Sequence, residues 1–221
     1  MPRGVIFDID GTLIDSVDAH AEAWQQAFAR YGYDIGFTDL RRQIGKGGDQ
    51  LLPIFLSPEA LKRDGHAIDQ AHGEIFRQHM LPHLKPFPAV RPLFQHLRAR
   101  GLRLALASSA KADELEAYER LAAVGDLIET ATSSADAEKS KPEPDIFAAA
   151  MARLRLPAAD LIVVGDSPFD AEAAGKIGLR TIGLLCGGFP EAELRAAGCI
   201  ALYADPADLL RRCDDSPLAV P

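Results

Sequence analysis

The sequence is poor in cysteine, in aromatic residues and in positive charge. Its 221 residues include three cysteines, one tryptophan and three methionines. Cys186, Cys199 and Cys213 are an odd number and lack the paired spacing of a structural zinc site. This scarcity argues against a disulfide framework and fits a reducing compartment, so we expect a cytoplasmic protein.

Positive charge is also in deficit. Lysine and arginine number 24 against 32 aspartates and glutamates, and the net charge is −8. This balance argues against a nucleic-acid partner and against an anionic membrane surface. The chain shows neither an apolar run of transmembrane length nor the pattern of a signal peptide, so we expect no membrane partner. An anionic substrate therefore needs a local cation or a metal, and the oligomeric state stays open.

The pattern of apolar residues changes after the first strand. A short apolar strand at residues 5–7 is followed by apolar residues at helical spacing up to about residue 85. Thr38 and Asp49 are the expected N-caps of two of these helices, and Pro58 suits the first turn of another. The helices are expected at residues 17–31, 38–44, 49–55 and 58–80.

Beyond the Pro-Phe-Pro sequence at 86–88, strands and helices alternate regularly. Near-continuously apolar strands in such an alternation predict an α/β fold with a Rossmann-like, doubly wound parallel sheet. We expect a catalytic core of residues 1–15 and 87–221, with an all-helical domain of residues 16–86 inserted after the first strand. The later strands are expected at residues 102–107, 127–130, 161–164, 180–185 and 199–202.

Two aspartates, Asp8 and Asp10, follow the first strand directly. Side chains two apart on a strand share a face, and each carboxylate then opposes the ionisation of the other. Gly11 permits a sharp turn, and Thr12 adds a hydroxyl near the same place. The pair indicates a cation between the carboxylates or a proton kept for catalysis, with a solvated strand end as the alternative.

Polar residues also follow other predicted strands, and ligands of an open parallel sheet bind beyond the carboxyl ends of its strands. Together these residues supply a hydroxyl, a cation and further carboxylates at the edge where Asp8 offers a nucleophile. They are Ser108 and Ser109 after the strand at 102–107, Asp166 and Asp170 after the strand at 161–164, and Lys141 ahead of a helix.

These stretches resemble the four motifs of the haloacid dehalogenase superfamily, in the family's order. The motifs are DIDGT at 8–12, the serine that follows LALA, KPEPD at 141–145 and GDSPFD at 165–170. The helical segment resembles the cap domain that many members insert after the first motif. The resemblance implies a phosphatase-type hydrolase of the phosphoglycolate phosphatase and β-phosphoglucomutase-like subfamily.

The resemblance also implies phosphoryl transfer through an aspartyl-phosphate, and the residues suit that chemistry. Asp8 would be the nucleophile, and Asp10 the general acid and base. Mg²⁺ would be bound by Asp8, the backbone carbonyl of Asp10 and Asp166. The phosphate would be held by Ser108, the N–H of Ser109 and Lys141, with Asp170 and Thr12 supporting these groups from behind.

The substrate is expected to be a small phosphorylated metabolite, and its other contacts should come from the cap. The loop 45–48 is rich in glycine, so its backbone can approach a ligand, and Lys46 within it can meet an anionic group. The alternative for this loop is a flexible, solvated one. His20, near the start of the first cap helix, is expected to be a packing or hinge residue rather than a catalyst.

Two other functions remain open. The first is a phosphomutase, because His20, Trp24 and the run LALAS resemble β-phosphoglucomutase. Against it, Gly165 stands where the resembled mutases carry a glutamate, and the loop at 44–49 lacks their arginine. The second is a non-catalytic binding protein on the same fold, which is disfavoured because every catalytic position is filled. Asp10 argues against dehalogenation, since the dehalogenases of the family lack this second aspartate.

Overall fold

The computed structural model describes residues 2–219; residues 1, 220 and 221, at the ends of the expected core, lie outside the described part. Within it, six parallel strands form one sheet in the order β3-β2-β1-β4-β5-β6. The predicted doubly wound parallel sheet is confirmed. The strands are β1 (Gly4–Phe7), β2 (Arg103–Ala107), β3 (Thr130–Thr132), β4 (Leu161–Gly165), β5 (Arg180–Leu184) and β6 (Cys199–Tyr203).

Strand β1 occupies the middle of the sheet because it is apolar on both faces. All four of its residues are buried, and Phe7 pairs with Leu106 of β2 on one side and Val164 of β4 on the other. The chain order reverses between β1 and β4, and such a switch point opens a crevice at the carboxyl ends of the two strands. The residues that follow β1 and β4 therefore meet at the crevice.

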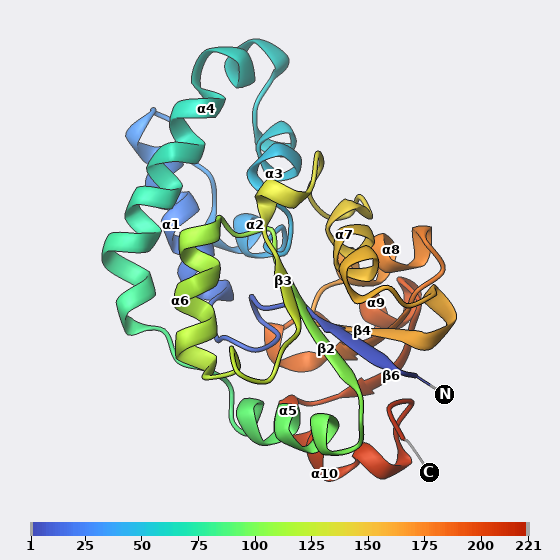
Figure 1. The fold of residues 1–221 in the computed structure, drawn as a ribbon. Coiled ribbons are helices and arrows are strands. Elements are labelled where there is room, and N and C mark those ends of the chain that lie inside the picture. The colour runs from blue at the N-terminus through green and yellow to red at the C-terminus, as the bar shows by residue number, and fades with distance from the viewer. Residues whose placement is uncertain (1, 220–221) are drawn as a thin grey trace.

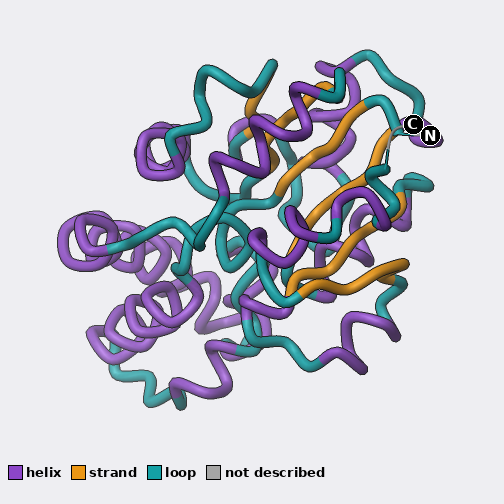
Figure 2. The backbone as a smooth tube through the Cα atoms, turned by 90° about the horizontal axis from the view of Figure 1, so that it is seen from below, coloured by secondary structure: helices purple, strands orange, loops and turns teal. Residues whose placement is uncertain are grey.

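Helices cover both faces of the sheet (Figure 2). Helices α5 (Val90–Ala99) and α10 (Pro206–Arg211) pack together on one face, with the apolar side chains of α6 (Ala112–Ala122) in the same cluster. Helices α7 (Asp145–Leu154) and α8 (Pro168–Lys176) pack on the other face. Helix α9 (Glu191–Ala196) lies against β6. Burial on both faces is what requires the near-continuous apolar character of the strands.

The segment between β1 and α5 is helical, as predicted, and lies beyond the sheet in Figure 1. Its two connections to the core run side by side, because Asp15 N–H donates to Lys85 O and Phe87 N–H donates to Leu13 O. The exact division into a core and a cap of residues 16–86 remains a prediction. The helices are α1 (Val17–Arg30), α2 (Phe37–Arg41), α3 (Gly48–Phe55) and α4 (Pro58–Ile75), the last continued by a π-helical turn (Phe76–Met80).

Some predicted details are wrong. Gly36 and Gly47, rather than Thr38 and Asp49, occupy the N-cap positions of α2 and α3. The Asp49 carboxylate instead accepts a hydrogen bond from the backbone N–H of Ser140, at 3.1 Å, across to the core. The third strand spans Thr130–Thr132 rather than 127–130, because Leu127 closes a turn against Val124. Pro58 begins α4, as predicted, and Ser57 caps it.

No helix among residues 2–219 is long and apolar enough to cross a membrane. Short 3₁₀ turns connect the longer elements. The turns are Leu81–His83, Ser134–Asp136, Ala158–Asp160, Leu185–Gly187 and Cys213–Asp215.

Candidate active site

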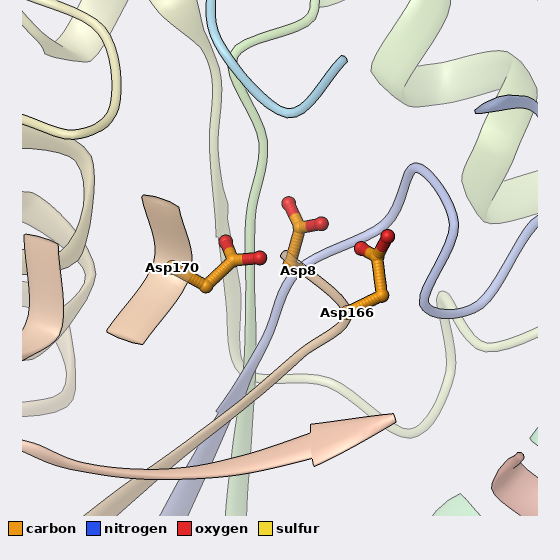
Figure 3. Close-up of side chains that lie close together, drawn as sticks. All are labelled: Asp8, Asp166 and Asp170. Carbon is orange, nitrogen blue, oxygen red and sulfur yellow. The ribbon is translucent and has the colours of Figure 1, made fainter. Parts of the chain in front are cut away.

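The strand ends bring three aspartates together. Asp8 follows β1, and its N–H donates to Val164 O of the neighbouring strand at 2.9 Å. Asp166 follows β4, and Asp170 lies in the first turn of α8. All three are buried, and one oxygen of each carboxylate lies within 4.8 Å of the others (Figure 3). Residues up to 162 positions apart in the chain thus form one carboxylate cluster.

Lys141 supplies the cation of this cluster. Its Nζ lies 2.6 Å from Asp8 Oδ1 and 2.8 Å from Asp170 Oδ1, and the side chain is 2% exposed. Burial by itself would lower the pKa of the lysine, but the charges of Asp170 and Asp8 outweigh it and raise the pKa above its ordinary value. Lys141 therefore carries a permanent positive charge against the nucleophile candidate.

The second oxygen of Asp170 is also occupied. Ser167 donates to Asp170 Oδ2 through its backbone N–H at 3.0 Å and its hydroxyl at 2.6 Å. The first of these bonds, with the one from Asp170 N–H to Ser167 Oγ, forms the capping box of α8. A carboxylate held on both oxygens keeps a single orientation. Asp170 therefore fixes the direction in which Lys141 approaches Asp8.

The cluster carries an excess of negative charge. Three carboxylates against Lys141 leave a formal charge of −2 if all are ionised. Burial raises the pKa of Asp8 to about 7 and the pKa of Asp166 well above its ordinary value. The neighbouring carboxylates raise both pKa values further, and the positive charge of Lys141 lowers them without cancelling the rise. Thr12 offers its hydroxyl to both, at 3.3 Å from Asp8 Oδ2 and 3.0 Å from Asp166 Oδ1.

This arrangement fits a divalent cation. The donors are carboxylate oxygens, which hard cations prefer, and a charge of +2 would offset the excess. The backbone also approaches Asp166 closely: a side chain at Gly11, where φ is +76°, or at Gly187 would overlap the Asp166 carboxylate. Glycine at both positions leaves that carboxylate room to point into the cluster.

Asp10 turns away from the other carboxylates. Its Oδ1 accepts hydrogen bonds from Ser16 Oγ at 2.6 Å and His20 Nε2 at 3.0 Å. Burial would raise the pKa of Asp10, but the attraction of His20 and the hydrogen bonds from His20, Ser16 and Tyr118 lower it to about 2. Within the described residues, the carboxylate cluster that could hold a cation therefore contains Asp8, Asp166 and Asp170, and the side chain of Asp10 is not part of it.

A cavity of about 90 Å³ lies between the helical segment and the core. Asp8, Asp10, Lys141 and Ser109 line it from the core. Within the described residues, the buried hydroxyl of Ser109 has no hydrogen-bond partner, so it is free to meet a ligand. Among the residues that line the other side are Trp24, Lys46, Asp69 and His72.

Ser108 lies deeper, and its hydroxyl accepts a hydrogen bond from Ala110 N–H at 3.0 Å. This bond closes a tight turn that directs the backbone after β2 toward the cavity. The neighbouring Ser109 lines the cavity and Ser108 does not, and the predicted contact of Ser108 with the phosphate stays a prediction.

The glycine-rich loop at 45–48 lies against the core. A Cβ at Gly45 would be 2.9 Å from Ser167 Oγ, and one at Gly47 would overlap the Ser140 hydroxyl, so the loop needs glycine for its approach. Lys46 Nζ donates to Gln43 Oε1 at 2.7 Å and lies 4.3 Å from the centre of the Phe169 ring. Burial lowers the pKa of Lys46, and its side chain borders the cavity.

The sequence analysis missed the surroundings of Asp10. His20 does pack, since its ring stacks on Phe76, but its Nε2 also contacts Asp10 and the Tyr118 hydroxyl, each at 3.0 Å. Ser16 and Tyr118 showed no local pattern that marks a functional residue. Tyr118 is one of several apolar residues on one side of a helix, and only the packing of α6 shows where its hydroxyl points.

The family model for haloacid dehalogenase-like hydrolases matches residues 5–184. The chain belongs to this family. The predicted resemblance is thereby confirmed. The carboxylate cluster and Lys141 come from the first, third and fourth of the sequence motifs.

Several known proteins are similar to most of the chain. A crystal structure of a hydrolase from Pseudomonas syringae has a TM-score of 0.87 and 27% identity, and covers 96% of this chain and 98% of that one. Phosphoglycolate phosphatase from Rhodospirillum rubrum is 27% identical over 95% of this chain and 90% of its own length. The Arabidopsis thaliana chloroplast protein SUPPRESSOR OF QUENCHING 1 is 31% identical over 88% of this chain, which spans only 19% of that longer protein.

Proposed function

We propose that the protein is a Mg²⁺-dependent phosphatase that hydrolyses a small phosphomonoester, a sugar phosphate or a phosphoglycolate-like metabolite, through an aspartyl-phosphate on Asp8. It is a phosphoric monoester hydrolase of the haloacid dehalogenase-like family. The observation that carries the proposal is the buried cluster of Asp8, Asp166 and Asp170 against Lys141, at the base of a small cavity. The size of the cavity supports a small substrate, and the scarcity of cysteine supports a cytoplasmic location.

Asp8 is the nucleophile in this proposal. One of its oxygens forms a bond to the phosphorus while the bond from phosphorus to the ester oxygen breaks, and the departing alkoxide takes a proton from Asp10. Water then attacks the aspartyl-phosphate, loses its proton to Asp10 and releases inorganic phosphate. Asp8 returns to its starting state, so the cycle consumes one water and one ester.

Attack of a carboxylate on a phosphate dianion requires compensating positive charge. Lys141 supplies one unit directly at Asp8, and Ser109 offers its hydroxyl and N–H to the phosphate oxygens. Ser108 holds the turn that presents Ser109, and Thr12 orients Asp8 and Asp166. A bound Mg²⁺, held by Asp8, Asp166 and the backbone carbonyl of Asp10, would neutralise further charge on the phosphate.

Asp10 is suited to both proton transfers. Without substrate it is ionised, because its pKa is about 2. A phosphate bound beside it adds negative charge, which raises its pKa and allows it to carry the proton for the leaving oxygen. Once the ester oxygen has departed, the ionised form of Asp10 accepts the proton of the attacking water.

The test measures phosphate release from a panel of small phosphomonoesters with Mg²⁺ and with EDTA. We expect release that requires the metal, and a loss of at least about a thousandfold in Asp8→Asn. Asp160→Asn is the matched control, because Asp160 precedes β4 at the opposite end of the sheet and pairs with Arg3. Wild-type turnover in Asp8→Asn would rule out the covalent mechanism.

The same assay separates a phosphatase from a phosphomutase. A mutase would form an isomerised sugar phosphate faster than free phosphate, and a phosphatase would form free phosphate alone. A non-catalytic protein would do neither. Gly165 favours the phosphatase, because the resembled mutases carry a glutamate at this position. Here a side chain at 165 would collide with Asp170.

A further inference from the structure

Polar side chains from two parts of the molecule surround the carboxylate of Asp10. Ser16 and His20, which donate to it, belong to the connection after β1 and to the first helix of the inserted segment. The third is Tyr118, on helix α6 of the core. Its hydroxyl lies 3.0 Å from His20 Nε2, the same nitrogen that contacts Asp10, and it helps to lower the pKa of Asp10.

His20 is itself fixed from its other side. Its ring lies parallel to Phe76 with 3.8 Å between ring centres, and its Nδ1 is 3.3 Å from His72 Nε2. Burial lowers the pKa of His72 well below its ordinary value, so His72 is neutral. The ionised carboxylate of Asp10 can only accept, so His20 Nε2 carries a proton and donates to it, while the contact with His72 Nε2 holds His20 Nδ1. The orientation of His20 is thereby determined before any substrate binds.

Tyr118 differs from the other two side chains because it is anchored in the core. It is 1% exposed, and its ring packs edge-on against Phe76 with 6.5 Å between ring centres. A phenylalanine would pack in the same way, so the hydroxyl is not needed for packing. Burying a hydroxyl is costly unless it is hydrogen-bonded, and its partner here is His20, which itself contacts Asp10.

We infer that Tyr118 is a positioning residue that aims the carboxylate of Asp10 at the leaving oxygen of the bound ester. The inference rests on the proposed function, in which Asp10 protonates that oxygen. Ser16 and His20 lie at the start of the helical segment, whereas the hydroxyl of Tyr118 comes from α6, which packs with the core. Tyr118 therefore fixes the position of Asp10 relative to Asp8 and Lys141, the core residues at which phosphoryl transfer takes place in the proposed function.

The test is Tyr118→Phe, measured on two aryl esters of similar size. Phenyl phosphate loses a leaving group that gains from protonation, whereas p-nitrophenyl phosphate loses a stable anion that needs little help. In Tyr118→Phe we expect kcat/KM for phenyl phosphate to fall about tenfold, while that for p-nitrophenyl phosphate changes less than about twofold. The ratio of the two values cancels any loss of folded protein, so a purely structural effect cannot produce this result.

Tyr203→Phe is the matched control, because Tyr203 is also buried but does not line the cavity. Its ratio for the two esters should equal that of the wild type. An unchanged ratio in Tyr118→Phe would overturn the inference.

Asp10→Asn distinguishes this failure from a failure of the proposed function. If Asp10→Asn selectively loses phenyl phosphate hydrolysis and Tyr118→Phe does not, Asp10 is the acid and Tyr118 does not position it. If Asp10→Asn shows no selectivity between the esters, the acid role of Asp10 in the proposed function is wrong, and the inference falls with it.

Discussion

Gly165 lies directly against the side chain of Asp170: a Cβ at position 165 would be 2.5 Å from Asp170 Cγ and 2.6 Å from Asp170 Cβ. No side chain fits there unless Asp170 moves, and Asp170 is held by Ser167 and Lys141. Packing in this structure therefore requires glycine at position 165, where the resembled mutases carry a glutamate.

Gly165→Ala should therefore destabilise the protein by about 1–3 kcal/mol and reduce activity, because the methyl group displaces Asp170 and with it Lys141. The matched control is Gly175→Ala in helix α8, where an added Cβ meets nothing within 4 Å. That substitution should be neutral or stabilising by up to about 1 kcal/mol, since alanine favours a helix. Urea denaturation measures both, and equal stabilities of the two variants would contradict the packing argument.

Lys141→Met should expose the charge imbalance of the carboxylate cluster. Removing one partner of a buried ion pair costs about 3–5 kcal/mol, so we expect the free energy of unfolding to fall by this amount when it is measured in EDTA. Mg²⁺ should recover part of it, because a bound cation replaces the missing charge and stabilises the folded state by mass action. The exposed Lys139→Met is the control for denaturation with EDTA and with Mg²⁺. Wild-type stability of Lys141→Met in EDTA would show that the lysine is not needed to balance the cluster.

Lys46→Met tests the role of the glycine-rich loop in binding the substrate. Lys46 borders the cavity but does not contact Asp8, so its loss should raise KM several-fold, about fivefold, and leave kcat within about twofold. Lys62→Met makes the same charge change at an exposed position of the same helical segment and should leave KM unchanged. A fall in kcat at constant KM would instead place Lys46 in the chemical step.

Asp208 predicts a pH-dependent stability away from the site. The hydrogen bond from Ala204 N–H, with help from Arg212 and Arg211, holds the pKa of Asp208 below its ordinary value. Its contribution is therefore present above the unfolded pKa, about 4, and is lost as pH falls through the lower folded pKa.

Thermal midpoints of the wild type and Asp208→Asn should differ at pH 7 and converge as the pH falls below the folded pKa of Asp208, where the carboxyl is protonated in both folded and unfolded chains. Asp34→Asn, at an exposed position, should follow the wild type throughout. A difference in thermal midpoint between the wild type and Asp208→Asn that stays constant with pH would show that the Asp208 charge does not contribute to stability.

Most of the fold was predictable from local pattern. The apolar run of β4 and the helical spacing after residue 17 each report burial that any packing of the chain must satisfy. The errors lie where a longer-range contact decides. Asp49 is a good N-cap by residue type, but its carboxylate bonds to Ser140 in the core instead. Residues 127–129 have strand-forming side chains, but the turn at Leu127 delays the pairing of β3.

The sequence by itself determined which chemical groups are present and at which strand ends they lie. Asp8, Lys141 and Asp166 were identifiable because a parallel sheet collects its strand ends at one edge, whatever the details of packing. Only the tertiary structure decided the direction of each side chain: Asp10 toward His20 and Tyr118, and Asp170 toward Lys141. These directions depend on which donors lie within about 3 Å, and donors from α6 and α1 become neighbours only when the chain has folded.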